Sequence, residues 1–196
     1  MADYDDIASE YDATRGGVAR AVEAAHAIDR LLPTRSTVLD LATGTGIVAR
    51  ELADLGHRTV GLDMSAGMLA LASPRLPGAL VRADAAALPF ADGTLEAIAA
   101  IWLLHLLDDA RPVLGEVARA LGSGGCFVTT ADKRAASRLS LGRVPGEGTA
   151  QDAAALLVRE CAAAGLELAG ATSFVGTGQT GPGRDPVYPV LAFRRA

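Results

Sequence analysis

The hydrophobic positions of this chain fall into two alternating patterns from about Thr37 onward. Short runs of β-branched and aliphatic residues, such as Val38-Leu39-Asp40-Leu41, have the length and composition of strands that are covered on both faces. Between most of these runs, apolar residues recur at helical spacing. The runs predict seven strands: Thr37–Leu41, Arg58–Leu62, Ala79–Arg82, Leu95–Ile101, Gly125–Ala131, Leu166–Phe174 and Tyr188–Arg194.

Strands that alternate with helices predict an α/β fold, in which a mostly parallel sheet has helices on both faces. The loop Val175–Pro186 is too short for a helical crossover, so the last strand should run antiparallel at the end of the sheet. Residues 17–32 have helical spacing and stop at Pro33. We expect a single domain over residues 1–196, with residues 1–33 as an amino-terminal helical cap and residues 34–196 as the α/β core.

Composition restricts the partners and the compartment. The net charge of −5 argues against nucleic acid as the main partner, since phosphate backbones are bound by clustered lysine and arginine. Uninterrupted apolar runs fall short of the roughly 20 residues that span a bilayer, and the acidic start is unlike a signal peptide. Cys126 lies in a predicted strand and Cys161 in an apolar helix, which favours buried free thiols. We expect a cytoplasmic protein without a membrane span.

The first strand runs into a glycine turn, Ala42-Thr43-Gly44-Thr45-Gly46, and then into a helix predicted over Ile47 to Leu55. The two glycines permit a tight turn and the close approach of a ligand, which can lie against amide groups at the helix start. Asp63 follows the second strand, roughly 20 residues beyond the turn, where a carboxylate can accept hydrogen bonds from both hydroxyls of a ribose. The alternative for Asp63 is a cap on the helix that follows it. The arrangement predicts a nucleotide-like ligand.

The turn alone fits more than one class of enzyme. The run Gly44-Thr45-Gly46-Ile47-Val48-Ala49 satisfies the G-x-G-x-x-G/A fingerprint of nicotinamide-dependent oxidoreductases. An acidic residue stands before the turn, however, giving Asp40-x-Ala42-x-Gly44-x-Gly46. This residue and the segments downstream of the turn favour a different family.

Three further stretches carry a resemblance to that family: Tyr4 to Asp12, Ala83-Asp84-Ala85-Ala86-Ala87-Leu88-Pro89-Phe90-Ala91-Asp92-Gly93-Thr94-Leu95-Glu96-Ala97-Ile98, and the region from Leu103 to Gly125. With the Asp40 turn, they resemble the class I S-adenosylmethionine (SAM)-dependent methyltransferases, especially the small-molecule group that includes ubiquinone- and menaquinone-biosynthesis methyltransferases. The resemblance covers nearly the whole chain and implies a Rossmann-like, seven-stranded sheet. Two other hypotheses stay open: an NAD(P)-dependent oxidoreductase, and a SAM-binding protein that transfers no methyl group and instead assists cyclisation or only binds.

The resemblance implies that SAM is the cofactor and S-adenosylhomocysteine (SAH) its product. Gly44 and Gly46 would lie under the methionine and ribose parts of SAM, with Asp40 near its amino group. Ala42 stands where the family commonly has glycine, so its methyl group could alter the turn or the approach of the methionine end. Carboxylates suit this ligand because SAM carries ammonium and sulfonium charges and no phosphate.

At the adenosine end, the resemblance implies that Asp63 holds the ribose hydroxyls and that Met64 packs on the adenine. Asp84 and the amide of Ala85 would recognise the adenine edge. The alternative for Asp84 is a turn residue before Leu88-Pro89.

Three more residues are candidates for the site. Tyr11 belongs to an amino-terminal segment that folds over the cofactor in similar enzymes, so we expect it to contact SAM. Trp102, beside the end of the fourth strand, can pack on the cofactor or form part of an acceptor wall, with core packing as the alternative. His105 is the candidate general base if the acceptor must lose a proton, and its alternative is a hydrogen-bonded support for its loop. The family's frequent Leu-His-His-x-x-Asp pattern has Leu104 in place of its first histidine here.

The acceptor is expected to be a small molecule that reacts through O, N or C, with quinone-like chemistry as one option. The segment Asp132–Gly148 is short for a substrate lid, which implies an open site or one completed by the second subunit of a homodimer. Its residues Arg134, Arg138 and Arg143 could attract an anionic acceptor, and the alternative is a solvated loop. The histidines and carboxylates lack the spacing of metal ligands, so we expect no metal site.

Overall fold

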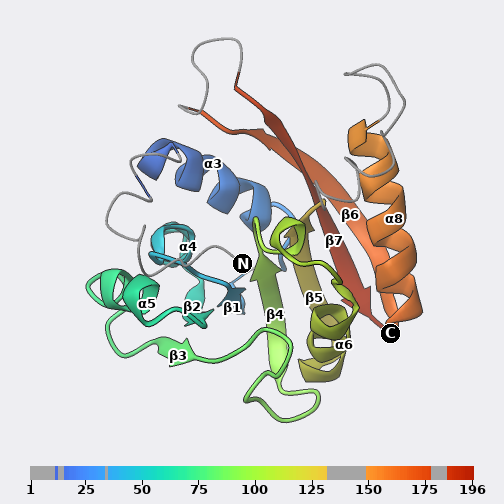
Figure 1. Ribbon diagram of the computed structural model, residues 1–196, viewed down its shortest axis with the longest axis horizontal. Coiled ribbons are helices and arrows are strands. Elements are labelled where there is room, and N and C mark those ends of the chain that lie inside the picture. The colour runs from blue at the N-terminus through green and yellow to red at the C-terminus, as the bar shows by residue number, and fades with distance from the viewer. Residues whose placement is uncertain (1–11, 13–15, 34, 132–148, 178–184) are drawn as a thin grey trace.

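A computed structural model describes Asp12 and residues 16–33, 35–131, 149–177 and 185–196, with the side chains of residues 149–153 outside the description. One mixed sheet organises the protein, in the strand order β3-β2-β1-β4-β5-β7-β6 (Figure 1). The strands are β1 Thr37–Leu41, β2 Arg58–Asp63, β3 Leu80–Arg82, β4 Leu95–Ala100, β5 Leu121–Thr130, β6 Leu166–Val175 and β7 Val187–Arg195.

The first five strands pair in parallel, and β7 pairs antiparallel with both β5 and β6. The predicted α/β fold with an antiparallel last strand is therefore confirmed. The strand order reverses between β1 and β4, because the chain adds β2 and β3 on one side of β1 and then returns to its other side. In open α/β sheets such a switch point is where ligands bind, outside the carboxyl ends of the strands.

Helices cover both faces of the sheet (Figure 1). The helices α3 Gly17–Asp29, α4 Ile47–Asp54 and α5 Ala66–Ala72 lie on one side, while α6 Arg111–Ala120 and α8 Thr149–Ala163 lie on the other. A short 3-10 turn, η2 Leu104–Leu106, follows β4. Helix α3 packs against α4 and β6.

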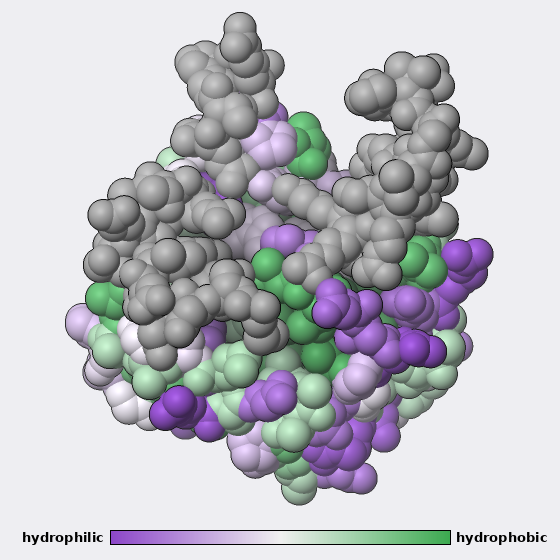
Figure 2. Space-filling view, in the orientation of Figure 1, coloured by the Kyte–Doolittle hydropathy of each residue, from purple (hydrophilic) through white to green (hydrophobic). Residues whose placement is uncertain are grey.

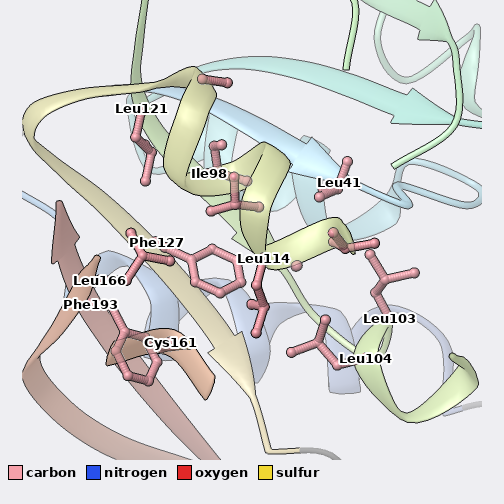
Figure 3. Packing of buried hydrophobic residues seen from close by; sticks show 14 of the residues in the cluster. Leu41, Ile98, Leu103, Leu104, Leu114, Leu121, Phe127, Cys161, Leu166 and Phe193 are labelled. Atoms are coloured by element: carbon pink, nitrogen blue, oxygen red, sulfur yellow. The ribbon is translucent and has the colours of Figure 1, made fainter. Parts of the chain in front are cut away.

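The two faces bury separate hydrophobic clusters because neighbouring residues of a strand point to opposite sides. On β1, Leu39 and Leu41 join the cluster under α6 and α8, whereas Val38 joins the cluster under α3 and α4. In the first cluster the rings of Phe127 and Phe193 lie 6.2 Å apart beside Leu114 (Figure 3). This alternation leaves Asp40 on the same face as Val38, directed toward α3 and α4 rather than α6 and α8.

Polar contacts of Arg119 hold the loop before β4, which forms most of the Ala83 to Ile98 run, against α6. The guanidinium donates to the carbonyl oxygens of Leu88 and Phe90 at 3.1 and 2.8 Å, and it pairs with Asp92 at 2.6 Å. It also binds Glu116, whose other contact is the amide of Leu88 at 2.7 Å. The same segment that carries the family resemblance is thus fixed in place by α6.

Several element ends differ from the sequence-based prediction. Strand β5 begins at Leu121 rather than Gly125, because Leu121 pairs with Leu95 before a register shift near Ala97. Its start, Leu121-Gly122-Ser123-Gly124, has the composition of a turn, so the pattern alone predicted the strand too late.

Cys126 and Cys161 are buried free thiols as expected, and burial raises the pKa of Cys161 to about 12. Within the described ranges, no helix has the length and apolar character needed to cross a membrane.

Candidate functional site

The glycine turn joins β1 to α4 in an unusual backbone conformation. Ala42, Gly44 and Gly46 all have positive φ values, of 59°, 56° and 74°. The amide of Thr43 donates to the carbonyl of Leu62 at 2.9 Å, which extends the β1–β2 ladder into the turn. The amide of Gly46 then donates back to the carbonyl of Thr43 at 2.9 Å. The turn is therefore tight, and it lies at the switch point of the sheet.

The two glycines of the turn meet different surroundings. A Cβ atom placed on Gly44 would have no atom of the described residues within 4 Å, so among these residues the position faces open space that a ligand can enter. A Cβ atom on Gly46 would lie 3.0 Å from Cβ of Ala72 and 3.2 Å from Cδ1 of Leu76. Gly46 thus allows α5 to pack closely against the start of α4, a role that its place in the fingerprint does not reveal.

Asp63 ends β2 and binds the turn directly. One carboxylate oxygen accepts the amide of Gly44 at 2.8 Å, and the other accepts the amide of Ser65 at 2.9 Å. The side-chain cap of α5 is Ser65, whose hydroxyl accepts the amide of Met68 at 3.0 Å, so Asp63 is not that cap. Each carboxylate oxygen has a second lone-pair direction available for a ligand hydroxyl.

Asp40 lies on β1 beside Gly61 of β2 and Ala99 of β4, and it is 4% exposed. The hydroxyl of Thr43 donates to it at 2.7 Å. Burial raises the pKa of Asp40 to about 7, the Thr43 hydrogen bond opposes this, and the negative charge of Asp63 adds to it. Gly61 makes room for the arrangement, because a Cβ atom there would lie 2.8 Å from the Thr43 side chain.

The residues assigned to the adenosine end lie beside Asp63. Met64 is 54% exposed, which is unusual for a large apolar side chain next to two buried carboxylates. The amide of Ala83 donates to the carbonyl of Asp63 at 3.1 Å, so the chain continues from β3 to Asp84 alongside Met64. Asp84 is exposed and accepts the amide of Ala86 at 2.9 Å, which is the turn contact considered as its alternative role. Met64 on one side, and Asp84 and Ala85 on the other, thus follow the carboxyl ends of the neighbouring strands β2 and β3.

One set of contacts at the turn escaped the sequence reasoning. Asp12 accepts the hydroxyl of Thr45 at 2.6 Å and pairs with Arg75 at 2.8 Å. Arg75 also donates to the carbonyl of Thr45 at 2.7 Å. These contacts tie Asp12 and Arg75, which follows α5, to the turn. They join residues that are 33 and 63 positions apart, so no local pattern could have identified them.

The remaining histidines, Trp102 and the other candidates lie at the end of β4, away from the turn, or outside the described residues. Trp102 and His105 follow β4 at the carboxyl edge of the sheet, and both are partly buried. Figure 2 shows apolar surface near the middle of this view, bordered by hydrophilic surface. His57 is buried elsewhere, between Asp29 and the amide of Ser36, and His26 is exposed on α3. Tyr11, Arg134, Arg138 and Arg143 lie outside the described residues.

Within the described ranges, no group of three or more histidine, cysteine, aspartate or glutamate side chains has an arrangement that could hold a metal ion. The described polar groups at the switch point are instead carboxylates, hydroxyls and backbone amides around open space at Gly44, together with the Arg75 guanidinium, whose charge is paired with Asp12. This chemistry fits a ligand with hydroxyl groups and positive charge.

Comparison with known proteins agrees with this chemistry. A family model described as a methyltransferase domain matches residues 39–129. A demethylmenaquinone methyltransferase of Renibacterium salmoninarum is 33% identical over 135 residues, which cover 64% of this chain and 55% of that protein. The chain spans about half the length of the curated relatives it matches.

Solved structures share the fold over nearly the whole chain. A SAM-dependent methyltransferase of Thermotoga maritima, described as a possible histamine N-methyltransferase, superposes with a TM-score of 0.75 at 18% identity and 98% coverage of both chains. The [4+2]-cyclase SpnF superposes with a TM-score of 0.74 at 18% identity, covering 98% of this chain and 94% of that one. At these identities the likeness shows the fold alone.

The methyltransferase-domain match over residues 39–129 and the similarity to demethylmenaquinone methyltransferases bear out the resemblance to SAM-dependent methyltransferases predicted from the sequence. Within that class, the chain is similar to the demethylmenaquinone methyltransferases. Of the two enzyme classes that the glycine turn left open, the match selects the methyltransferases over the nicotinamide-dependent oxidoreductases.

Ala42 generates a prediction about stability. Its φ of 59° is costly for any residue with a Cβ atom, so Ala42→Gly should stabilise the protein by about 1 kcal/mol, or about 2–4 °C in Tm. The matched control is Ala118→Gly, because Ala118 is also partly buried against the same cluster but lies inside α6. There the same change should destabilise by about 1 kcal/mol. Thermal unfolding of both variants measures the difference, and a loss of stability in both would contradict the assignment of strain to Ala42.

Asp40 generates a prediction about pH. The folded protein keeps a proton on Asp40 up to about pH 7, whereas the unfolded chain releases it near its ordinary pKa of 3.8. The contribution of Asp40 to the free energy of unfolding should therefore fall as pH rises from about 4 to about 7. Asp40→Asn keeps an oxygen that can accept the Thr43 hydroxyl and removes the titration.

Urea unfolding of the wild type and Asp40→Asn at several pH values checks this expectation. The variant should gain stability over the wild type as pH rises from about 4 to about 7, and the difference should level off above that range. A difference that stays constant over the range would mean that Asp40 has the same charge in the folded and unfolded states.

Proposed function

We propose that this protein binds SAM in the glycine turn and transfers its methyl group to a small-molecule acceptor in the cytoplasm. The observation that carries the proposal is the contact of Asp63 with Gly44, because it places a buried carboxylate against the open side of the turn. The relatives named demethylmenaquinone methyltransferases make a quinone-like molecule the first acceptor to test.

The residues on the β1 and β2 side fit each part of SAM. Asp63 offers lone pairs to the ribose hydroxyls while its bonds to Gly44 and Ser65 hold it in place. Asp40 lies across the turn, where an ammonium group would stabilise its ionised form. Met64 presents an exposed apolar side chain on which a flat adenine ring can pack, with Asp84 and Ala85 at its edge.

Bound SAM supplies an electrophilic methyl group that an acceptor nucleophile takes in an in-line displacement. The contribution of the protein is to position the two reactants and to exclude water. Asp40, Asp63 and the turn fix the cofactor from the β1 and β2 side, so the acceptor has to approach from the carboxyl ends of β4 and β5. Trp102 and His105 follow β4 at that edge.

Calorimetry and a methyl-transfer assay separate the hypotheses. SAM and SAH should bind with 1:1 stoichiometry, and NAD and NADP should not bind. Binding of NADH without binding of SAM would reject the proposal. If SAM binds, tritiated methyl incorporation into menaquinone precursors and into extracts of the native host distinguishes a methyltransferase from a SAM-binding protein that transfers no methyl group. Persistent absence of a labelled product would favour the latter.

Among the residues of the site, Asp63 is the one whose replacement should reduce the affinity for SAM most. We expect Asp63→Ala to reduce SAM affinity by roughly 1–3 kcal/mol, or about 5- to 150-fold, because buried hydrogen bonds to the ligand and to the Gly44 amide are both lost. The matched control is Asp54→Ala, which removes the same charge from the exposed side of α4, where Asp54 pairs with Arg50. Calorimetric titration should give the control an affinity like that of the wild type. Equal affinities of wild type and Asp63→Ala would remove Asp63 from the site.

His105 is proposed as the general base for acceptors that must lose a proton. His105→Ala should then leave SAM affinity within about twofold of wild type while turnover falls about 100-fold or more. Turnover of such an acceptor, once labelled product identifies one, measures this directly. A variant with unchanged turnover would show that His105 supports its loop and takes no part in proton transfer.

A further inference from the structure

Trp102 has a backbone conformation that is rare for a bulky residue. It follows β4 with a φ of 63°, in the left-handed region that favours glycine. Its amide donates to the hydroxyl of Thr130 at the end of β5, at 3.1 Å. Such a conformation is strained, and residues that keep it cluster at functional sites. The chain therefore places the Trp102 side chain at the carboxyl edge of the sheet at a cost in stability.

Three side chains from distant parts of the chain hold the indole ring. Phe174 of β6 and Tyr188 of β7 form a stacked pair, and each meets the indole edge to face at 5.8 Å. The guanidinium carbon of Arg20, from α3, lies 3.8 Å above the ring, and Arg20 is 7% exposed. The indole is thus fixed on its edges by aromatic rings and on one face by a cation.

The indole nitrogen of Trp102 is packed but lacks a hydrogen bond to the part of the chain that the structure describes. Nε1 of Trp102 is buried, and no atom of the described residues forms a hydrogen bond with it. An unpaired buried donor destabilises the folded protein, and native proteins contain few of them. One residue therefore combines a strained backbone with an unsatisfied donor, beside the switch point that holds Asp40 and the turn.

We propose that the indole N–H of Trp102 binds an oxygen of the methyl acceptor and that Arg20 positions the indole and favours an oxygen that carries negative charge. The acceptor class is then a molecule that presents an enolate, phenolate or similar oxyanion. This inference rests on the proposed methyltransferase function. An acceptor bound there has to displace atoms that now cover Nε1, and the hydrogen bond that it forms contributes free energy to that displacement.

The experiment uses the indole itself as the reporter. Trp102 is the single tryptophan of the chain, so its indole N–H gives one assignable NMR signal. The probe is 4-hydroxycoumarin, an enolate at neutral pH, and its control is coumarin, which has the same rings without the enol oxygen. In the SAH-bound protein, 4-hydroxycoumarin should move the indole signal downfield and bind at least about tenfold more tightly than coumarin. Absence of any change in the signal at millimolar 4-hydroxycoumarin overturns the proposal, and this measurement requires no variant.

Variants test the donor and the cation separately by calorimetry. Trp102→Phe keeps a ring and removes the N–H, so the preference for 4-hydroxycoumarin over coumarin should disappear while SAH affinity stays within about twofold. Arg20→Lys should keep most of the preference because it keeps the charge, and Arg20→Met should lose it. If Trp102 and Arg20 were only structural, the variants would change Tm and leave the ratio of the two affinities unaltered, which would overturn the proposal.

Binding of SAH to the wild type separates this inference from the proposed function. If SAH does not bind, the methyltransferase proposal itself fails. If SAH binds and the indole does not respond to 4-hydroxycoumarin, the cofactor site stands and the acceptor role of Trp102 is rejected.

Discussion

The carboxylate of Asp63 joins the parts of the site that the fold alone leaves separate. It accepts the amide of Gly44 from the turn and the amide of Ser65 from the start of α5, so one side chain fixes the ends of β1 and β2 relative to each other. Gly46 allows α5 to approach closely enough for this, and Asp12 and Arg75 hold the turn from its other side. The position of the turn, and therefore of any ligand in it, depends on that carboxylate.

The electrostatics of the site complement this geometry. Asp40 and Asp63 bring two carboxylates to one turn, and burial together with the charge of Asp63 raises the pKa of Asp40 to about 7. Two acids held in this way disfavour an anionic ligand and favour a cation with hydroxyl groups. A dinucleotide with phosphate groups fits the glycine fingerprint equally well, but its negative charges would be repelled by Asp40 and Asp63. The match to methyltransferases therefore agrees with the charge of the site as well as with the fold.

Local patterns in the sequence were sufficient for the strands, the turn and the acids that end the strands. The strand Thr37–Leu41 has the predicted limits, and Asp63 lies at the predicted edge of the sheet. Contacts between distant segments were not predictable in this way. The bond from Asp63 to Gly44, the pairing of Asp12 with Arg75, and the rings of Phe174 and Tyr188 around Trp102 all depend on tertiary packing. Ala42 lies between these two cases. The sequence shows an alanine where the resembled family commonly has glycine, but only the backbone φ of 59° shows that the residue is strained.

The side of the site that we propose for the cofactor and the side that we propose for the acceptor rest on different observations. Hydrogen bonds of known length define the first, and a strained tryptophan with an unsatisfied donor marks the second. The most direct test of the central claim is a crystal structure of the SAH complex. The account predicts both ribose hydroxyls within hydrogen-bonding distance of Asp63, with the Gly44 contact retained. SAH bound with its ribose away from Asp63 would contradict it.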